Sequence, residues 1–518
     1  MEGAALPWVR LRPYLRPVLT TVSLAGLLLL ASIAPSAAGG PAAPGAIASA
    51  AGPFASAAGP FASAAGPSPP SPALAVSPLA TSILSPARLP RTLQAAWAQR
   101  AAAASLARAV SPAALGGAAA SRASCVAVAQ DGRTIYQYHS HRPVLPASNM
   151  KLLTATALLD RLGPGYRFRT RVMVLAPPLG GVVHGDLYLV GGGDPLLRLP
   201  SYAASLMYGG PIYTNLTHLV PLLEAAGVRQ VTGGVVGDAS RYDSLTSVRS
   251  WPASYAEQGD VGLLSALAVD DGMAQAGGAV PAAAGPAWQA AGIVSNLLGQ
   301  HGIALGADPS TGTAPSGART LVSLVSPPLR EILKEVLHES DNTAMELMTK
   351  ELGLKVSGHG STAAGVAAVR ADLAADGLPL EGFVNVDGSG LSRDDRVTCA
   401  LLLATIERAG AHSILTEDLP VAAESGTLAD EMKGTVAAGR VDAKTGSLNG
   451  VKALSGWVLP VPGESPGNAA LARPLAFSVV LNGLSSSIAN PDLLTDRIAV
   501  DLAGYPEAPA LALFEPSS

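Results

Sequence analysis

The order of strand and helix patterns is the feature that most restricts how this chain can fold. Alternating segments rich in β-formers lie near both ends of the folded part, at 125–138 and within 440–481. Between them, especially across 328–409, apolar residues recur at helical spacing. This order predicts a sheet whose first and last strands pair across the sequence. The predicted fold class is therefore α/β (α+β), an antiparallel sheet flanked by helices, with a mixed α/β insertion.

Local patterns divide the folded part into individual elements. Asp131-Gly132 separates two alternating runs and predicts a tight hairpin turn. Further strands are predicted at 167–175, 182–190, 231–238, 440–446, 451–459 and 476–481. Helices are predicted at 92–110, 148–162, 219–226, 287–298, 328–337, 343–352, 363–373, 398–409 and 491–502. Strands and helices are therefore mixed in the interval between 166 and 319.

The first 38 residues have the composition of a targeting segment. Three arginines precede an apolar run of 17 residues, 18–34, and small residues follow at 36–38. The run is long for the apolar part of a signal peptide and short for a membrane span. We therefore expect export, with the segment acting either as a cleaved signal peptide or as a retained signal anchor.

A low-complexity tract of alanine, glycine, proline and serine follows at 39–90 and repeats a seven-residue unit. Such a tract cannot bury enough apolar surface to offset the entropy lost on ordering, so it is predicted to be a disordered linker. The predicted domains are a leader at 1–38, the linker at 39–90, one domain formed by 91–165 and 320–510, and an inserted α/β part at 166–319.

Charge and motif content exclude several classes of function. The net charge of −4 gives no electrostatic basis for binding nucleic acid. The eight histidines form no His-Glu-x-x-His pattern, and the glycine-rich run Gly191–Pro195 lacks the Gly-Lys-Ser/Thr of a phosphate-binding loop. Asp270-Asp271-Gly272 is predicted to be a turn. No metal or other cofactor is therefore expected.

The two cysteines, Cys125 and Cys399, leave two interpretations open. Neither lies in a Cys-x-x-Cys pattern, which argues against a redox or metal role. In an exported protein they could form one disulfide. Because Cys399 lies in an apolar helical run, two separate buried thiols are an equally good interpretation.

Ser148-Asn149-Met150-Lys151 opens a helical run and can supply a nucleophile with its base. Residues three apart at a helix start lie on one face, so the lysine nitrogen can reach the serine oxygen. The helix N-terminus and a second cation would lower the pKa of Lys151, as a neutral-amine base requires. Only seven of the 34 basic residues are lysines, and an arginine could not lose its proton at neutral pH.

Two further motifs follow along the chain. Ser340-Asp341-Asn342 offers a second hydroxyl for proton relay and an amide that can hold both a lysine and a substrate carbonyl. Lys444-Thr445-Gly446 lies in a predicted strand and combines a cation and a hydroxyl with a glycine that lets a substrate backbone approach. Each motif alone has an ordinary structural explanation, as a helix cap or a strand end. The three in this order indicate serine acyl-transfer chemistry.

The three motifs resemble those of the penicillin-recognising serine acyl transferases, which share Ser-x-x-Lys, Ser-x-Asn and Lys-Thr-Gly. The long interval before Ser340 is similar to that of the D-alanyl-D-alanine carboxypeptidase/endopeptidase family, the class C low-molecular-mass penicillin-binding proteins, which carry inserted domains there. Further matches lie at 191–195, 325–329, 387–392 and 443–448. The resemblance covers about residues 90–505 and implies a transpeptidase-like fold in the cell envelope. It implies peptidoglycan stem peptides ending in D-Ala-D-Ala as substrates, and β-lactam antibiotics as inhibitors.

On this resemblance the catalytic residues are Ser148, Lys151, Ser340 and Asn342. Ser148 is the nucleophile and Lys151 its base, while Ser340 passes a proton to the departing D-alanine and Asn342 orients the groups. The substrate-binding residues are Lys444, Thr445, Gly446 and Ser447. Lys444 and Thr445 bind the terminal carboxylate, and the backbone N–H groups of Ser148 and Ser447 form the oxyanion hole.

Two rival functions remain compatible with the same motifs. A β-lactamase-like hydrolase would release the acyl group quickly, usually through an added glutamate in a more compact chain. A catalytically silent cell-wall binding protein would keep the fold without turnover. The long insertion argues against the first, and the presence of every catalytic residue type argues against the second.

Overall fold

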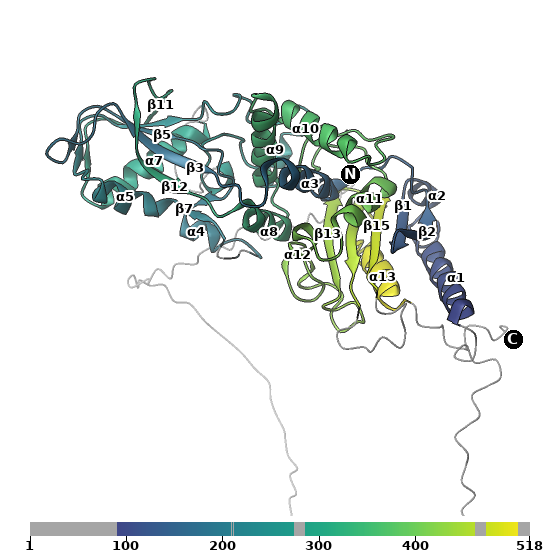
Figure 1. Ribbon diagram of the computed structural model, residues 1–518. Helices are drawn as coiled ribbons and strands as arrows, with labels where there is room; N and C mark the ends of the chain where they lie inside the picture. The colour runs from purple at the N-terminus through teal and green to yellow at the C-terminus, as the bar shows by residue number, and fades with distance from the viewer. Residues whose placement is uncertain (1–90, 209, 211, 274–284, 461–472, 506–518) are drawn as a thin grey trace, which may run out of the picture. The chain divides into compact units, whose positions relative to one another are not determined.

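The computed structural model describes residues 91–505 except 209, 211, 274–284 and 461–472 (Figure 1). The longer helices are α1 (Arg91–Ala109), α3 (Met150–Leu162), α5 (Leu219–Ala225), α7 (Pro286–Gln300), α8 (Leu329–Glu339), α9 (Asn342–Ser357), α10 (Thr362–Ala375), α11 (Cys399–Ala409) and α13 (Asp492–Ala503). Short helices are α2 (Ala118–Arg122), η2 (Ala147–Asn149), α4 (Pro200–Ala203), η3 (Leu216–His218), α6 (Ser254–Glu257), η4 (Asp270–Gly272), α12 (Ile414–Glu417) and η5 (Gly426–Leu428). Every helix predicted from the sequence is present, with ends shifted by a few residues.

The strands are β1 (Cys125–Gln130), β2 (Arg133–Tyr138), β3 (Arg169–Val174), β4 (Val182–Val183), β5 (Leu187–Val190), β6 (Leu197–Arg198), β7 (Thr214–Asn215), β8 (Gln230–Val231), β9 (Val235–Asp238), β10 (Ala304–Leu305), β11 (Ser310–Thr311), β12 (Arg319–Val325), β13 (Val441–Leu448), β14 (Val451–Val458) and β15 (Leu475–Asn482). The leader and the linker predicted at 1–90 lie outside the described residues. Within the described part of the chain, no helix is both long enough and apolar enough to span a membrane.

The first sheet joins the two ends of the folded sequence. Its strand order is β13-β14-β15-β1-β2, with neighbours antiparallel. β1 pairs with β15, so that Cys125 lies opposite Val480. The β1–β2 connection has left-handed backbone at Asp131 and Gly132, as a tight hairpin turn requires. The predicted pairing of first and last strands and the predicted fold class are both confirmed.

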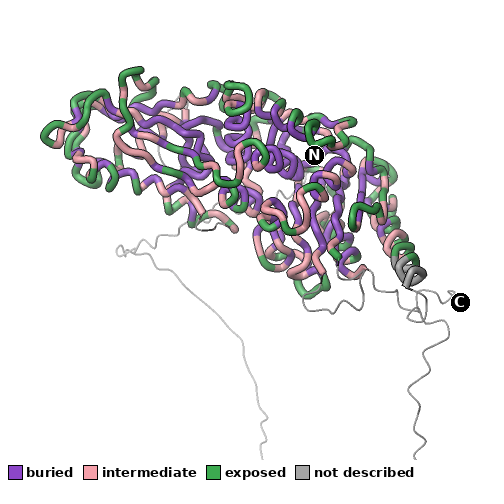
Figure 2. The backbone as a smooth tube through the Cα atoms, viewed as in Figure 1, coloured by how far each residue is buried: buried purple, intermediate pink, exposed green. Residues whose placement is uncertain are grey.

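Helices cover both faces of this sheet, and alternate residues of β1 pack into two different apolar clusters. Val126 and Val128 pack in the apolar cluster with α1 and α13. Cys125, Ala127 and Ala129 lie in the cluster formed with α3, α8, α9, α10 and α11. Alternate residues of a strand point to opposite faces, which explains this division. The purple segments in Figure 2 run through the sheet and the adjoining helices.

A second, mixed sheet lies in the interval between the first two sequence motifs. Its order is β11-β9-β5-β3-β12, and a three-stranded sheet, β10-β8-β4, lies in the same interval. Apolar residues of these strands form their own buried cluster with α5 and α7. The exact division of the chain at 166 and 319 remains a prediction, but this interval has a hydrophobic core of its own.

The predicted continuous strands 182–190 and 231–238 are wrong, because each divides between two sheets. β4 and β8 belong to the three-stranded sheet, whereas β5 and β9 belong to the five-stranded one. Gly185 has φ of 108°, where a side chain is strained, and it redirects the first segment. At Gly233, an added Cβ would lie 2.7 Å from the carbonyl carbon of Gly185, so the two breaks pack together.

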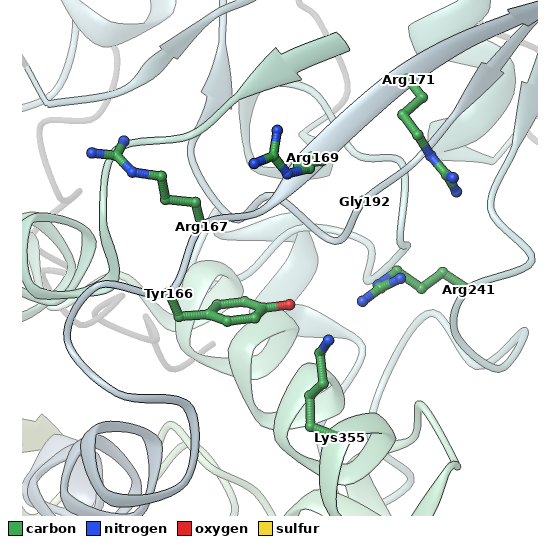
Figure 3. Close-up of a pocket in the computed structure, with 7 residues that line it drawn as sticks. All are labelled: Tyr166, Arg167, Arg169, Arg171, Gly192, Arg241 and Lys355. Carbon is green, nitrogen blue, oxygen red and sulfur yellow. The ribbon is translucent and has the colours of Figure 1, made fainter. Parts of the chain in front are cut away.

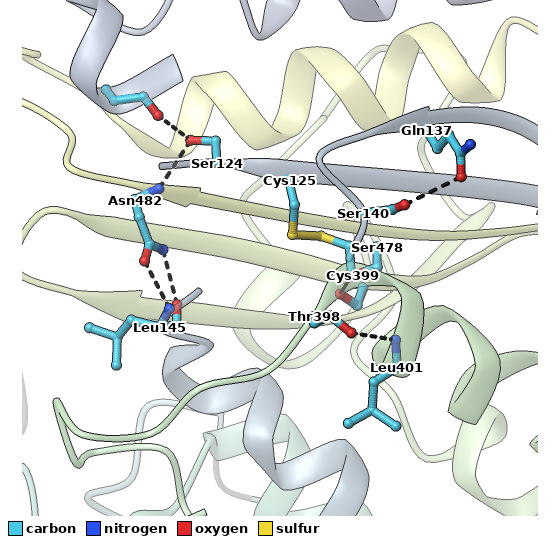
Figure 4. Close-up of a disulfide and its surroundings, with 12 residues drawn as sticks. Ser124, Cys125, Gln137, Ser140, Leu145, Thr398, Cys399, Leu401, Ser478 and Asn482 are labelled. Atoms are coloured by element: carbon cyan, nitrogen blue, oxygen red, sulfur yellow. Dashed lines mark hydrogen bonds between the residues drawn. A yellow bond between two sulfur atoms is a disulfide. The ribbon is translucent and has the colours of Figure 1, made fainter. Parts of the chain in front are cut away.

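The two cysteines form a disulfide, which decides between the two interpretations left open by the sequence (Figure 4). Cys125 begins β1 and Cys399 begins α11, and both side chains are fully buried. Thr398 caps α11 by accepting a hydrogen bond from the Leu401 N–H. The disulfide therefore fixes the start of a covering helix to the start of β1, an inner strand of the first sheet.

Removing this disulfide should destabilise the protein strongly, because it joins residues 274 positions apart. Closing such a long loop restricts the unfolded chain, and the loss on removal is about 2–5 kcal/mol. We expect Cys125→Ala/Cys399→Ala to lower the free energy of unfolding by that amount in denaturant titrations. Reduced wild-type protein is the control and should show a similar loss. Coincident unfolding midpoints for oxidised wild type and the double variant would contradict this role.

Candidate active site

Ser148 lies in η2, immediately before α3, and the segment that precedes it is tied to the first sheet. The backbone of Val144 bridges to that of Val397. The Leu145 N–H donates to Asn482 Oδ1 at 2.8 Å, and Asn482 Nδ2 donates back to the Leu145 carbonyl at 3.0 Å (Figure 4). These contacts hold the segment from both sides, so the position of Ser148 is set by the sheet.

The residue before Ser148 has an unusual backbone conformation. Ala147 is fully buried with φ of 49°, in the left-handed region that side chains other than glycine seldom adopt. The loop that contains Gly390 packs directly over it, since an added Cβ at Gly390 would lie 1.9 Å from the Ala147 carbonyl oxygen. Local strain of this kind is maintained only where the surroundings fix it, and it often marks a functional site.

Lys151 is completely buried and binds three separate segments of the chain. Its Nζ donates to Ser148 Oγ at 3.2 Å, to Asn342 Oδ1 at 2.6 Å and to the Ser389 carbonyl at 2.8 Å. A fully buried amine is tolerated only when it is hydrogen-bonded. The structure therefore brings Ser148, Lys151 and Asn342 together as the sequence predicted, and adds Ser389. The predicted lowering of the Lys151 pKa stays a prediction.

The second motif lies at the junction of α8 and α9. Ser340 ends α8 with a left-handed conformation, φ 58°, and Asp341 caps α9 by accepting from the Ala344 N–H. Ser340 is partly exposed, and no hydrogen bond joins its Oγ to another residue in the described ranges. Asn342 Nδ2 donates to the Asp260 carbonyl at 2.7 Å. The amide is therefore oriented at its oxygen by Lys151 and at its nitrogen by Asp260, which lies in the interval between the first two motifs.

The third motif lies on β13, the edge strand of the first sheet. Lys444 is fully buried, and its Nζ donates to the Thr445 carbonyl at 3.0 Å. Asn149, next to Ser148, donates from Nδ2 to the Lys444 carbonyl at 3.0 Å. An added Cβ at Gly446 would lie 3.1 Å from both Asn149 Nδ2 and the Pro146 carbonyl, so a glycine lets η2 approach the strand closely. The first and third motifs are thus in direct contact.

The remaining residues predicted to bind substrate lie further along the same strand. Thr445 donates from Oγ1 to Thr427 Oγ1 at 2.7 Å, and both Thr445 and Ser447 are partly exposed. Ser447 lies opposite Lys452 of β14. These positions leave the hydroxyl-bearing residues of β13 accessible beside η2, where a substrate strand could lie along the sheet edge.

A buried carboxyl group that no sequence motif marks supports the site around Lys151. Glu346, on α9, accepts through Oε1 from the N–H groups of Gly388 and Ser389, at 2.8 and 2.7 Å. Burial, followed by the nearby Asp387, raises the pKa of Glu346 to about 8. Its Oε2 is buried without a hydrogen-bond partner in the described part of the chain. Glu346 thereby holds the Ser389 carbonyl in place for Lys151.

Arg198, which lies in the interval between the first two motifs, is a second residue of the site that sequence analysis did not select. It is 1% exposed and donates to Asp341 Oδ2 at 2.7 Å, to Asp271 at 3.2 Å and to Glu335 at 3.5 Å. Burial and the charge of Asp271 raise the pKa of Asp341 to about 7, while Arg198 opposes that rise. Asp270-Asp271, which was predicted to be a turn, forms η4, and Asp271 is part of this network.

Together the fold and the site define a serine enzyme of the penicillin-recognising class. The D-Ala-D-Ala carboxypeptidase 3 (S13) family matches residues 102–287 and 277–502. The chain belongs to this family, and it is a serine-type peptidase.

Individual relatives agree with this assignment. A D-alanyl-D-alanine carboxypeptidase of Actinomadura sp. (strain R39) is 33% identical over 443 residues, covering 72% of this chain and 79% of that protein. Carboxypeptidase DacB of Mycolicibacterium smegmatis is 31% identical over 387 residues, covering 72% and 77%. The crystal structure of penicillin binding protein 4 (dacB) from Haemophilus influenzae matches the fold with a TM-score of 0.60 at 21% identity, covering 73% of this chain and 95% of that one.

The raised pKa of Glu346 predicts a pH-dependent stability. Its pKa is about 8 in the folded protein and about 4.5 when unfolded, so between these values the folded state holds the extra proton. The contribution of Glu346 to the free energy of unfolding is therefore largest below pH about 4.5. It is lost as the pH rises toward 8, with a slope approaching about 1.4 kcal/mol per pH unit. We expect Glu346→Gln to flatten the dependence of unfolding free energy on pH across this window. Equal slopes for variant and wild type would contradict the assignment.

Replacing Arg198 should cost far more than replacing an exposed arginine. Arg198→Met leaves buried carboxyl groups without their cation, a change that typically costs about 3–5 kcal/mol. Chemical unfolding measures the loss, with Arg319→Met on the exposed part of β12 as the matched control, expected to change stability by about 0.5 kcal/mol or less. Similar small losses in both variants would mean that the Arg198 network does not stabilise the site.

Proposed function

We propose that this peptidase removes the terminal D-alanine from peptidoglycan stem peptides through an acyl-enzyme on Ser148. The observation that supports it is the contact of the buried Lys151 Nζ with Ser148 Oγ, at 3.2 Å, beside Asn342 and the Lys444 strand. Nucleophile, base and substrate-binding strand thus lie together. Family membership supports the choice of a D-Ala-D-Ala bond as the target.

In the acylation step, Lys151 as a neutral amine takes the proton of Ser148 Oγ while that oxygen attacks the carbonyl carbon between the two D-alanines. The backbone N–H groups of Ser148 and Ser447 bind the resulting oxyanion, a contribution of about 3–4 kcal/mol per donor in other enzymes. Ser340 relays the proton to the departing nitrogen, the C–N bond breaks and D-alanine leaves. A water molecule then hydrolyses the ester, and Lys151 again accepts the proton.

Substrate recognition uses the edge of β13. Lys444 supplies positive charge and Thr445 a hydroxyl for the terminal carboxylate, and Gly446 lets the substrate backbone lie close to the strand. Asn342 orients the scissile amide together with Lys151. Penicillin binding protein 4 from H. influenzae has been solved in complex with a β-lactam, and we propose that β-lactams acylate Ser148 of this chain in the same pocket.

The proposed location follows from the substrate, because peptidoglycan lies outside the cytoplasmic membrane. Residues 1–38 would direct export, as a signal peptide or as a membrane anchor, and 39–90 would act as a flexible spacer. Sequencing the N-terminus of the mature protein distinguishes cleavage from retention. We further propose that 91–165 and 320–510 form the catalytic domain and that 166–319 is inserted into it.

Labelled penicillin tests the roles of Ser148 and Lys151. Wild type should be acylated, Ser148→Ala should not, and Lys151→Ala should be acylated at least about 10²–10⁴-fold more slowly, as loss of a general base predicts. Lys433→Ala, which removes an exposed lysine paired only at the surface, should match wild type. Acylation of Ser148→Ala, or a Lys151→Ala rate within a few-fold of wild type, would contradict the assigned roles.

The products distinguish the peptidase from its rivals. Slow release of the penicillin label favours a peptidase, whereas fast release favours a β-lactamase-like hydrolase. Digestion of defined peptidoglycan fragments, read by mass, should yield free D-alanine. Cleavage of cross-linked fragments would add endopeptidase activity, and an acylated protein that releases no product from any fragment would be a silent binding protein.

A further inference from the structure

Five cationic side chains surround a cavity of about 360 Å³ that the proposed reaction does not use. Arg167, Arg169 and Arg171 come from the segment leading into β3 and from β3 itself, and Arg241 and Lys355 lie on other elements. Figure 3 shows these side chains and Tyr166 arranged around one space, with Gly192 on its wall. Such a concentration of positive charge is unexpected in a chain whose net charge is −4.

This cavity is separate from the catalytic residues. Asn342 begins α9 and Lys355 lies near its end, which places them about 20 Å apart at ~1.5 Å per residue. Lys151 begins α3, and Tyr166 follows the end of that helix. α3 and α9 contact each other and therefore have the catalytic site at their N-terminal ends and the cavity at their C-terminal ends.

One wall of the cavity is rigidly built. Glu351 is fully buried and accepts from Arg241 Nε and Nη2 at 2.9 and 2.7 Å, and from Tyr166 Oη at 2.5 Å. This carboxylate neutralises Arg241 and fixes both side chains. Lys355 Nζ lies 5.1 Å from the centre of the Tyr166 ring. The wall is therefore organised before any ligand arrives.

The other wall carries charge that the protein leaves uncompensated. Within the described ranges, no ion pair joins Arg167, Arg169 or Arg171 to a carboxylate. Arg167 instead donates from Nη1 to the Ser326 carbonyl at 2.6 Å. Arg167 and Arg169 are exposed and Arg171 is partly exposed, so a ligand can reach all three from solvent. Neighbouring guanidinium groups repel one another, and a bound anion would reduce that repulsion.

The spacing of these arginines favours a linear ligand. Arg169 and Arg171 are two residues apart on β3 and share one face of the strand, with about 7 Å between their Cα atoms. Arg167 continues the same spacing before the strand. Gly192, from the glycine-rich run singled out in the sequence, lets the backbone pack against Arg169, since an added Cβ would lie 2.1 Å from the Arg169 carbonyl. Arg167, Arg169 and Arg171 thus form a row at alternate positions of the chain along one wall of the cavity.

We propose that this cavity binds a linear ligand carrying two or more phosphate groups. Arginine forms paired hydrogen bonds with phosphate, and several donors converging on one space match the several acceptor oxygens of each phosphate better than the two of a carboxylate. The ligand would lie along the arginine row with Arg241 and Lys355 on the opposite wall. This site goes beyond the peptidase reaction and uses none of its residues.

Titration calorimetry of the whole protein at low ionic strength tests the proposal with tripolyphosphate, inorganic phosphate and citrate as probes. Tripolyphosphate should bind saturably and more tightly than the other two. Arg169→Gln/Arg171→Gln should weaken it by at least about tenfold, as loss of two charge-assisted contacts predicts. Arg108→Gln/Arg133→Gln, which removes two exposed arginines elsewhere, is the matched control and should stay within about twofold.

Several results would overturn the proposal. These are no saturable binding of tripolyphosphate, equal losses in the two double variants, or citrate or inorganic phosphate binding as tightly as tripolyphosphate. Thermal unfolding confirms that each variant is folded, and Lys355→Gln offers a second variant with an exposed side chain. Penicillin acylation should be unchanged in all of them, so a failure of the peptidase assignment would be seen in wild type, independently of phosphate binding.

Discussion

The buried amino group of Lys151 makes the interactions on which the arrangement of this protein depends. A fully buried amine destabilises a fold unless it is hydrogen-bonded, and here its partners come from Ser148, Asn342 and Ser389. These residues lie in segments far apart in sequence. Satisfying this one amine therefore fixes η2, the start of α9 and the 387–392 loop against one another, and the same geometry places Lys151 beside Ser148, as the proposed reaction requires.

Two of these acceptors are held in turn by further hydrogen bonds. The buried Glu346 fixes the Ser389 backbone, and the Asp260 carbonyl fixes the Asn342 amide. The buried Arg198 binds Asp341, which caps α9 immediately before Asn342. Asp260 and Arg198 lie in the interval between the first two motifs. This interval therefore contributes directly to the geometry of the site. Pre-organised support of this kind lets a catalytic group act without rearranging during the reaction.

Much of the fold and of the candidate site could be predicted from the sequence, because apolar periodicity indicates secondary structure and the three motifs indicate the chemistry. The hairpin at Asp131-Gly132, the helices and the pairing of β1 with β15 all followed from such patterns. Contacts between distant buried polar groups could not be predicted, since Glu346 and Arg198 lie in ordinary helical or strand contexts with no motif of their own. The breaks at Gly185 and Gly233 were missed because apolar alternation continues across them while the chain changes sheets. The disulfide was undecided because burial alone does not distinguish a paired thiol from a free one.

Acylation of Ser148 Oγ beside Lys151 is the step on which the proposed reaction depends most. Peptide mapping by mass spectrometry after treatment of the intact protein with a β-lactam tests this directly. We predict a single covalent adduct, on the peptide that contains Ser148. An adduct on Ser340 or on another side chain, with Ser148 unmodified, would contradict it.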